Sequence, residues 1–95
     1  MIYIKYNPQE VRLQLRGHAE QAPAGQDIVC AGVSALYGAL ALHPMVNEHQ
    51  EHDWHVLTAE NGAQGVMKPM FDMIANGMAD IAKQYKDNVL CGFVL

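Results

Sequence analysis

Alternation between apolar and polar positions predicts several short β-strands. Residues 1–6 and 10–16 each place apolar side chains at every second position, namely Ile2, Ile4 and Tyr6, then Val11, Leu13 and Leu15. Because successive strand residues point to opposite faces, each segment is expected to bury one face. Residues 7–9 are Asn-Pro-Gln, which favours a hairpin turn between the two strands. Three further strands are predicted over residues 45–50, 54–59 and 89–95.

Two segments with apolar residues at helical spacing predict helices over residues 28–43 and 68–85. Asp27 can cap the first, and Pro44 ends it. This helix is apolar nearly all round, which predicts burial against the sheet and against another helix or a partner subunit. Pro69 is expected in the first turn of the second helix, where proline is tolerated. The expected inward stripe of the second helix is Met70, Met73, Ile74, Gly77, Ile81 and Tyr85.

The predicted order of elements is β-β-α-β-β-α-β in a single domain spanning residues 1–95. Consecutive strand pairs favour a mostly antiparallel sheet, and two helices would pack on it. The fold class expected from this order is therefore a small α+β sandwich.

Composition narrows the functional classes. Half the residues are apolar and 17% are charged, with a net charge of −4, which is typical of a globular chain. The six Lys and Arg residues are scattered, so direct nucleic-acid binding is not expected. The longest uncharged stretch is interrupted by polar residues and Gly, so we expect no membrane association. Two cysteines and an N-terminus unlike a signal peptide predict a cytoplasmic protein with reduced thiols.

Candidate chemistry is concentrated in residues 17–34. Gly17-His18-Ala19 is expected to end a strand, a polar loop follows, and Cys30 would lie in the first turn of the first helix. A helix N-terminus and a neighbouring histidine both favour a thiolate, which is the nucleophilic form of cysteine. The imidazole of His18 could then pass a proton to a leaving group, and N–H groups of the same turn could hold an oxyanion.

Three neighbours of this pair have supporting roles in the same interpretation. Gly17 allows unusual backbone angles beside the site. Asp27 is interpreted as a helix cap, with orientation of the imidazole as a second role. Ser34 lies one turn after Cys30 and could support the site through a hydrogen bond, or could bond back to a helix carbonyl. Gly25 is interpreted as a loop hinge.

The remaining cysteine and histidines favour plainer interpretations. Cys91 lies in an apolar strand and is expected to pack in the core, without a disulfide to Cys30. The His-rich segment 49–55 lacks the ligand geometry of a metal site and is interpreted as a solvated hairpin, so neither a metal nor another cofactor is expected. The methionines between 67 and 78 have helical spacing, which favours core or dimer contacts.

Several of these residues together resemble the signature of the bacterial ribosomal-processing cysteine proteases. They are Gly17-His18-Ala19, Gly25, Asp27 to Ala31, and Ser34, while Gly32 replaces the second alanine usual in that family. The resemblance implies a Cys30–His18 dyad, a homodimer, and a loop that contains Ala19 and Gly25 and orders around substrate. It also implies removal of an N-terminal extension from a large-subunit ribosomal protein, with bulky apolar or aromatic residues just before the cut.

Other functions stay open at this point. A divergent or prophage-borne paralogue could cleave a different protein with the same dyad. A non-catalytic binding module of the same fold, or a thiol switch based on Cys30, would belong to other functional classes. The alternatives differ in whether Cys30 reacts quickly and whether that reactivity depends on His18.

Overall fold

The computed structural model describes residues 1–17 and 24–93, with the backbone alone considered for 24–27. Five strands and two helices follow one another in the predicted order β-β-α-β-β-α-β, which confirms the α+β fold class. The elements are β1 (Ile2–Asn7), β2 (Arg12–Arg16), α1 (Ala24–Ala41), β3 (Val46–Glu51), β4 (Trp54–Ala59), α2 (Gln64–Gln84) and β5 (Val89–Phe93). Within the described part of the chain, neither helix combines the length and the apolar character needed to cross a bilayer.

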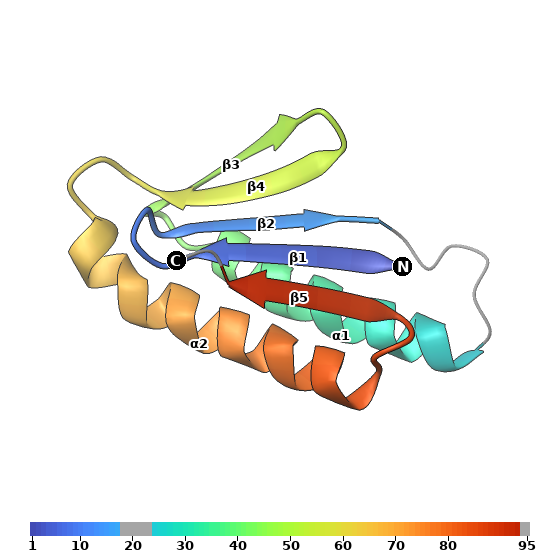
Figure 1. Ribbon diagram of the computed structural model, residues 1–95. Helices are drawn as coiled ribbons and strands as arrows, with labels where there is room; N and C mark the ends of the chain where they lie inside the picture. The colour runs from blue at the N-terminus through green and yellow to red at the C-terminus, as the bar shows by residue number, and fades with distance from the viewer. Residues whose placement is uncertain (18–23, 94–95) are drawn as a thin grey trace.

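All five strands form one sheet in the order β3-β4-β2-β1-β5. Three neighbouring pairs are antiparallel, and the pair β1–β5 is parallel. Figure 1 shows how α2 carries the chain back along the sheet, so that β5 runs beside β1 in the same direction. The first hairpin turn is held by Asn7, whose side-chain oxygen accepts the N–H groups of Gln9 and Glu10, each at 3.1 Å.

Both helices cover the same face of the sheet (Figure 1), and the core lies between these two layers. The predicted alternation of β1 is confirmed, because Ile2, Ile4 and Tyr6 are all buried. Their partners across the core are Val29, Val33 and Leu40 of α1 and Met67, Phe71, Ile74, Ala75 and Met78 of α2. The buried side chains of the sheet and of both helices therefore form one continuous apolar core.

The opposite face of the sheet carries a cation held between aromatic rings. The guanidinium carbon of Arg16 lies 4.8 Å from the ring centroids of both Tyr3 and Trp54. Such stacking is favourable because the ring faces are electron-rich. Three strands are thus tied together where β2 ends, immediately before the candidate histidine.

Both helices begin earlier than the sequence pattern predicts. Helix α1 starts at Ala24, so Gly25 and Asp27 belong to its first turn, and the assignments of Asp27 as the cap and Gly25 as a loop hinge are wrong. Helix α2 starts at Gln64, which places Pro69 in the second turn instead of the first. Because Pro69 has no N–H to donate to the carbonyl of Gly65, α2 lacks one backbone hydrogen bond near its start.

The buried stripe of α2 is also rotated from the predicted one. Met70 and Met73 are exposed, whereas Met67 and Phe71 are completely buried. An earlier helix start brings Met67 into the periodic pattern, and Met67, Phe71, Ile74 and Met78 then repeat at three- and four-residue intervals. Helix α1 was predicted to be buried on several sides. The face of α1 that points away from the sheet is nevertheless exposed to solvent, although its residues are apolar.

A short polar connection joins the sheet to α2 and makes stability depend on pH. The hydroxyl of Tyr6 donates to Asp72, and Lys68 lies 2.8 Å from the same carboxylate. The Lys68 ammonium, and then the Tyr6 hydroxyl, lower the pKa of Asp72. Burial, and then the bond to Asp72, raise the pKa of Tyr6. The folded state therefore favours an ionised Asp72 and a neutral Tyr6.

These two shifts have opposite consequences at the two ends of the pH range. The Asp72 contribution is present above its unfolded pKa, about 4, and is lost as pH falls; the Tyr6 contribution is present below about pH 10 and is lost as pH rises. We expect Tyr6→Phe to cost about 1–2 kcal/mol at pH 7 through the lost hydrogen bond. Urea unfolding should show a smaller alkaline decline in Tyr6→Phe than in the wild type; part of the decline remains because burial also raises the pKa of Tyr37. The exposed Tyr85→Phe variant should keep the full decline. An unchanged alkaline decline in Tyr6→Phe would contradict this assignment.

Candidate active site

Cys30 lies deeper in its helix than the sequence suggests. It is the seventh residue of α1, in the second turn, because the helix begins at Ala24. The side chain is half-buried and packs against the core cluster. Only the first four N–H groups of a helix lack an intrahelical acceptor. The prediction that Cys30 occupies the first turn is therefore wrong, and the N–H groups of its own turn do not provide an oxyanion site.

The Cys30 side chain lines a cavity of about 290 Å³ between α1 and the sheet. Cys30, Ser34 and Tyr37 lie on one face of α1, at spacings of four and three residues. Leu15 and Gly17 come from the end of β2, and Glu48 and His55 come from the β3–β4 hairpin. Leu15 and His55 are direct partners in the antiparallel pair, so their side chains share the helix-covered face. Three separate segments thus line the cavity that Cys30 faces.

Gly17 has the backbone conformation that was predicted for it. Its φ is +95°, a region that residues with a Cβ rarely adopt. A Cβ on Gly17 would lie 2.2 Å from the carbonyl oxygen of Met1, so only glycine allows β2 to turn this close to the start of β1. The next residue is His18. His18 and Ala19, named in the sequence analysis as base and loop residue, lie outside the described residues.

The end of the cavity away from Cys30 is polar. The hydroxyl of Tyr37 donates to Oε2 of Glu48 at 2.8 Å, and the rings of Tyr37 and His55 meet edge to face with centroids 6.4 Å apart. Burial, and then the bond to Glu48, raise the pKa of Tyr37, so its hydroxyl remains a donor at neutral pH. The carboxylate is therefore held by a fixed donor at the cavity wall.

Sequence reasoning did not place Tyr37, Glu48 or His55 in the site. One signal was present, since Tyr37 continues the helical spacing that relates Cys30 to Ser34. Glu48 and His55 depend on strand pairings that are distant in sequence. Ser34 does line the cavity, as expected of a supporting residue.

The other histidines of the hairpin are separated from this cavity. His49 bonds Glu51 at 2.7 Å, and His52 lies in the turn with φ of +57°. Residues 49 and 55 point to opposite faces, since the residue opposite His49 is Val56. Among the residues that the structure describes, no three His, Cys, Asp or Glu side chains converge as metal ligands.

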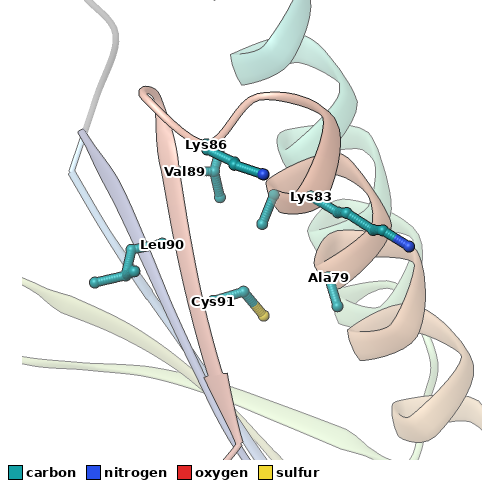
Figure 2. Close-up of a pocket in the computed structure, with 7 residues that line it drawn as sticks. Ala79, Lys83, Lys86, Val89, Leu90 and Cys91 are labelled. Carbon is teal, nitrogen blue, oxygen red and sulfur yellow. The ribbon is translucent and has the colours of Figure 1, made fainter.

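Cys91 lies in a different cavity, of about 270 Å³, between β5 and α2. Figure 2 shows its sulfur pointing toward α2, on the side where Ala79 and Lys83 are labelled. Burial raises the pKa of the Cys91 thiol, which favours its neutral form. The lining of this cavity contains no histidine, and Cys91 packs against the core as the sequence predicts. Both cysteines are free.

Comparison with known proteins bears on this geometry. Residues 1–90 match the family model described as cysteine protease Prp. A crystal structure of an essential ribosomal processing protease Prp from S. aureus, in complex with a substrate peptide, is similar with a TM-score of 0.77 and 16% identity, covering 99% of this chain and 100% of that one. A second S. aureus Prp structure, with a covalently linked product peptide, has a TM-score of 0.73 and 20% identity, again covering 99% and 100%.

A Streptococcus mutans protein has a TM-score of 0.71 and 19% identity, covering 98% of this chain and 91% of that chain. At these identities the solved structures establish the fold. No curated protein matches the chain.

Proposed function

Because this chain belongs to the Prp family of cysteine proteases, we propose that it is a ribosomal processing enzyme in which Cys30 is the nucleophile and His18 the base. The substrate would be a large-subunit ribosomal protein that carries an N-terminal extension. The S. aureus structures, of a ribosomal processing protease with substrate and product peptides, support this substrate class. One observation carries the assignment of the nucleophile, namely that Cys30 opens into a cavity reached by the end of β2.

The proposed reaction needs only a thiolate and an imidazole. The Cys30 thiolate attacks the scissile carbonyl carbon and forms a C–S bond, while His18 gives its proton to the departing amine as the C–N bond breaks. Water then attacks the thioester while His18 takes a proton from that water, and the carboxylic acid product leaves as the C–S bond breaks, which restores the Cys30 thiolate and the protonated His18. No metal or organic cofactor takes part.

The location of Gly17, the residue before His18, supports the assignment of His18 as the base. Gly17 lines the Cys30 cavity, and a single residue step moves the chain only about 3.8 Å. His55 also lines this cavity and is therefore the natural control histidine. With His18 as base, His18→Ala abolishes cleavage and His55→Ala does not.

Thiol reactivity separates a protease from the alternative functions. We expect iodoacetamide to modify Cys30 at least tenfold faster than Cys91 at neutral pH, because a thiolate reacts and a neutral thiol does not. His18→Ala should slow modification of Cys30, and His55→Ala should leave it unchanged, as measured by peptide mass spectrometry. Equal rates for the two cysteines would favour a non-catalytic binding module of the same fold.

Supporting roles are proposed for the neighbouring residues. Asp27 lies in the first turn of α1, where a carboxylate could orient the imidazole of His18. Ser34 lines the cavity one turn beyond Cys30, where its hydroxyl could bond substrate. Ala19 belongs to the stretch that is proposed to order around the peptide. Cytoplasmic localisation, where ribosomal proteins are made, is part of the same proposal.

A homodimer is the most direct explanation for the outward face of α1. Its apolar residues share one side of the helix and are exposed: Ile28, Ala31, Ala35, Ala39 and Leu42. The side chain of Leu42 is 85% exposed and that of Ile28 is 69% exposed. Apolar surface of this kind is typical of an interface between subunits.

Leu42→Glu tests the proposed interface. A buried, unpaired carboxylate disfavours association, so sedimentation velocity should show a dimer for the wild type and a monomer for Leu42→Glu. Leu90→Glu places the same charge at an exposed position on the sheet and should remain dimeric. A Leu42→Glu protein that stays dimeric would place the interface elsewhere.

The substrate itself is tested by direct cleavage. The host's large-subunit protein with its N-terminal extension should be cut at one bond by the wild type. Failure to cut it, together with fast modification of Cys30, would favour a divergent paralogue that cleaves another protein.

A further inference from the structure

We infer that Glu48 makes the far end of the Cys30 cavity a subsite for a cationic side chain of the substrate. This inference rests on the proposed function, because it takes the cavity to be where the peptide binds. The inferred subsite would recognise a lysine or arginine of the substrate at a set distance from the cleaved bond. Apolar or aromatic residues next to that bond are compatible with it.

The chemistry of the subsite follows from the residues that line it. Leu15 and the Tyr37 ring offer apolar surface along which an alkyl chain could lie, and Glu48 supplies a negative charge beyond them. The cavity lining contains no Lys or Arg. A long side chain with an apolar stem and a cationic end matches this order of surfaces.

Tyr37 gives the carboxylate a defined place. Its hydroxyl donates to Oε2 of Glu48 at 2.8 Å, so the carboxylate is oriented before any ligand arrives. One hydrogen bond uses only part of the acceptor capacity of a carboxylate, which can accept about four. The remaining sites can accept from an ammonium or guanidinium group, and charge-assisted bonds of this type are stronger than neutral ones.

The distance along α1 sets the position of the recognised residue. Cys30 and Tyr37 are seven residues apart, which corresponds to about 10 Å along a helix with a rise of 1.5 Å per residue. An extended peptide advances about 3.3 Å per residue. The cationic residue is therefore expected two or three residues from the cleaved bond, and not beside it.

The test measures binding, so that it does not depend on cleavage. The probes are fluorescein-labelled decapeptides of Ala, Ser and Gly around a central Phe-Phe pair, with one lysine moved through each other position. Matched peptides carry norleucine, which has a similar stem without the charge. Fluorescence anisotropy with the Cys30→Ala protein gives the dissociation constant of each peptide.

Glu48 is exposed, and we expect lysine to bind about fivefold more tightly than norleucine at one position two or three residues from the Phe-Phe pair, which is the upper end of the range for exposed ion pairs. Glu48→Gln should remove this ratio, and Glu48→Lys should reverse it, so that norleucine binds more tightly than lysine. Glu60→Gln changes the same charge at an exposed position outside the cavity and should retain it. Tyr37→Phe should reduce the ratio in part, since the carboxylate stays but loses its fixed donor.

Each other outcome of the binding measurement overturns the inference. If the preference for lysine persists in Glu48→Gln, another group recognises the lysine. If lysine and norleucine peptides bind equally at every position, no cationic subsite exists. Peptides that fail to bind at all would also end it. If the wild type cleaves nothing while the Glu48-dependent ratio is present, the protease proposal fails and the subsite stands as a peptide-binding site.

Discussion

Cys30→Ala is expected to lose essentially all proteolysis, with kcat lowered on the order of 10⁴-fold or more, as when other hydrolases lose their nucleophile. The cause is chemical, because no other side chain of the cavity lining can form the acyl intermediate as readily as a thiolate. The methyl group of alanine fits within the space of the lost side chain, so folding should persist. Initial rates on the extended ribosomal protein, with circular dichroism to confirm folding, provide the measurement.

Cys91→Ala is the matched control for this loss. It removes a half-buried thiol from the other cavity, between β5 and α2, and should cleave at a rate near that of the wild type. If Cys30→Ala keeps more than a tenth of the activity, or if Cys91→Ala loses it, the assignment of the nucleophile is wrong.

Gly17→Ala is expected to destabilise the fold by about 3 kcal/mol through two costs that act together. A residue with a Cβ at φ of +95° is strained by about 1–2 kcal/mol. The new methyl group would also lie 2.2 Å from the carbonyl oxygen of Met1, so the start of β1 must move. Since His18 follows directly, the displacement should lower activity as well as stability. Urea unfolding and cleavage assays measure the two effects.

Gly62→Ala separates these two costs. Gly62 has φ of +84°, but a Cβ there would meet nothing within 4 Å. It should therefore cost only the backbone strain, about 1–2 kcal/mol, and leave cleavage unchanged. Equal destabilisation by the two variants would show that the contact with Met1 contributes nothing.

The first two strands were predictable from sequence because each carries a local signal of period two. β4 was predicted over Trp54–Ala59 and has those bounds, and β3 is shifted by one residue to Val46–Glu51. The last strand is described as Val89–Phe93, and residues 94–95 lie outside the described part. The parallel pairing of β1 with β5 has no local signal, since it joins the two ends of the chain through space.

The helix starts were mistaken because polar residues and glycine favour loops in a local reading. Gly25 and Asp27 lie in the first turn of α1, and Gly65 lies in the first turn of α2. Tertiary packing favours the earlier start of α2, because a helix that begins before Lys68 places Met67 on its buried face. The first turn of a helix contributes little apolar periodicity, so its start is weakly encoded.

The candidate site was predictable in part. A short motif identifies Cys30 and His18 from sequence, and Ser34 follows by one helical turn. Glu48 and His55 reach the same cavity only through the pairing of β4 with β2 and β3, which no local pattern specifies. The proposed nucleophile and base are therefore found in a motif, whereas the residue proposed to select the substrate depends on the assembled sheet.

Trapping of the covalent intermediate tests the central claim most directly. Wild-type protein mixed with the extended ribosomal protein and quenched in acid within the first turnover should show an adduct with the mass of the cleaved extension. Proteolytic mapping should place this thioester on Cys30, and Cys30→Ala should show no adduct. Cleavage that proceeds with an adduct on another residue would contradict the account. Cleavage that proceeds without any adduct, under conditions where His18→Ala slows the chemical step, would contradict it as well.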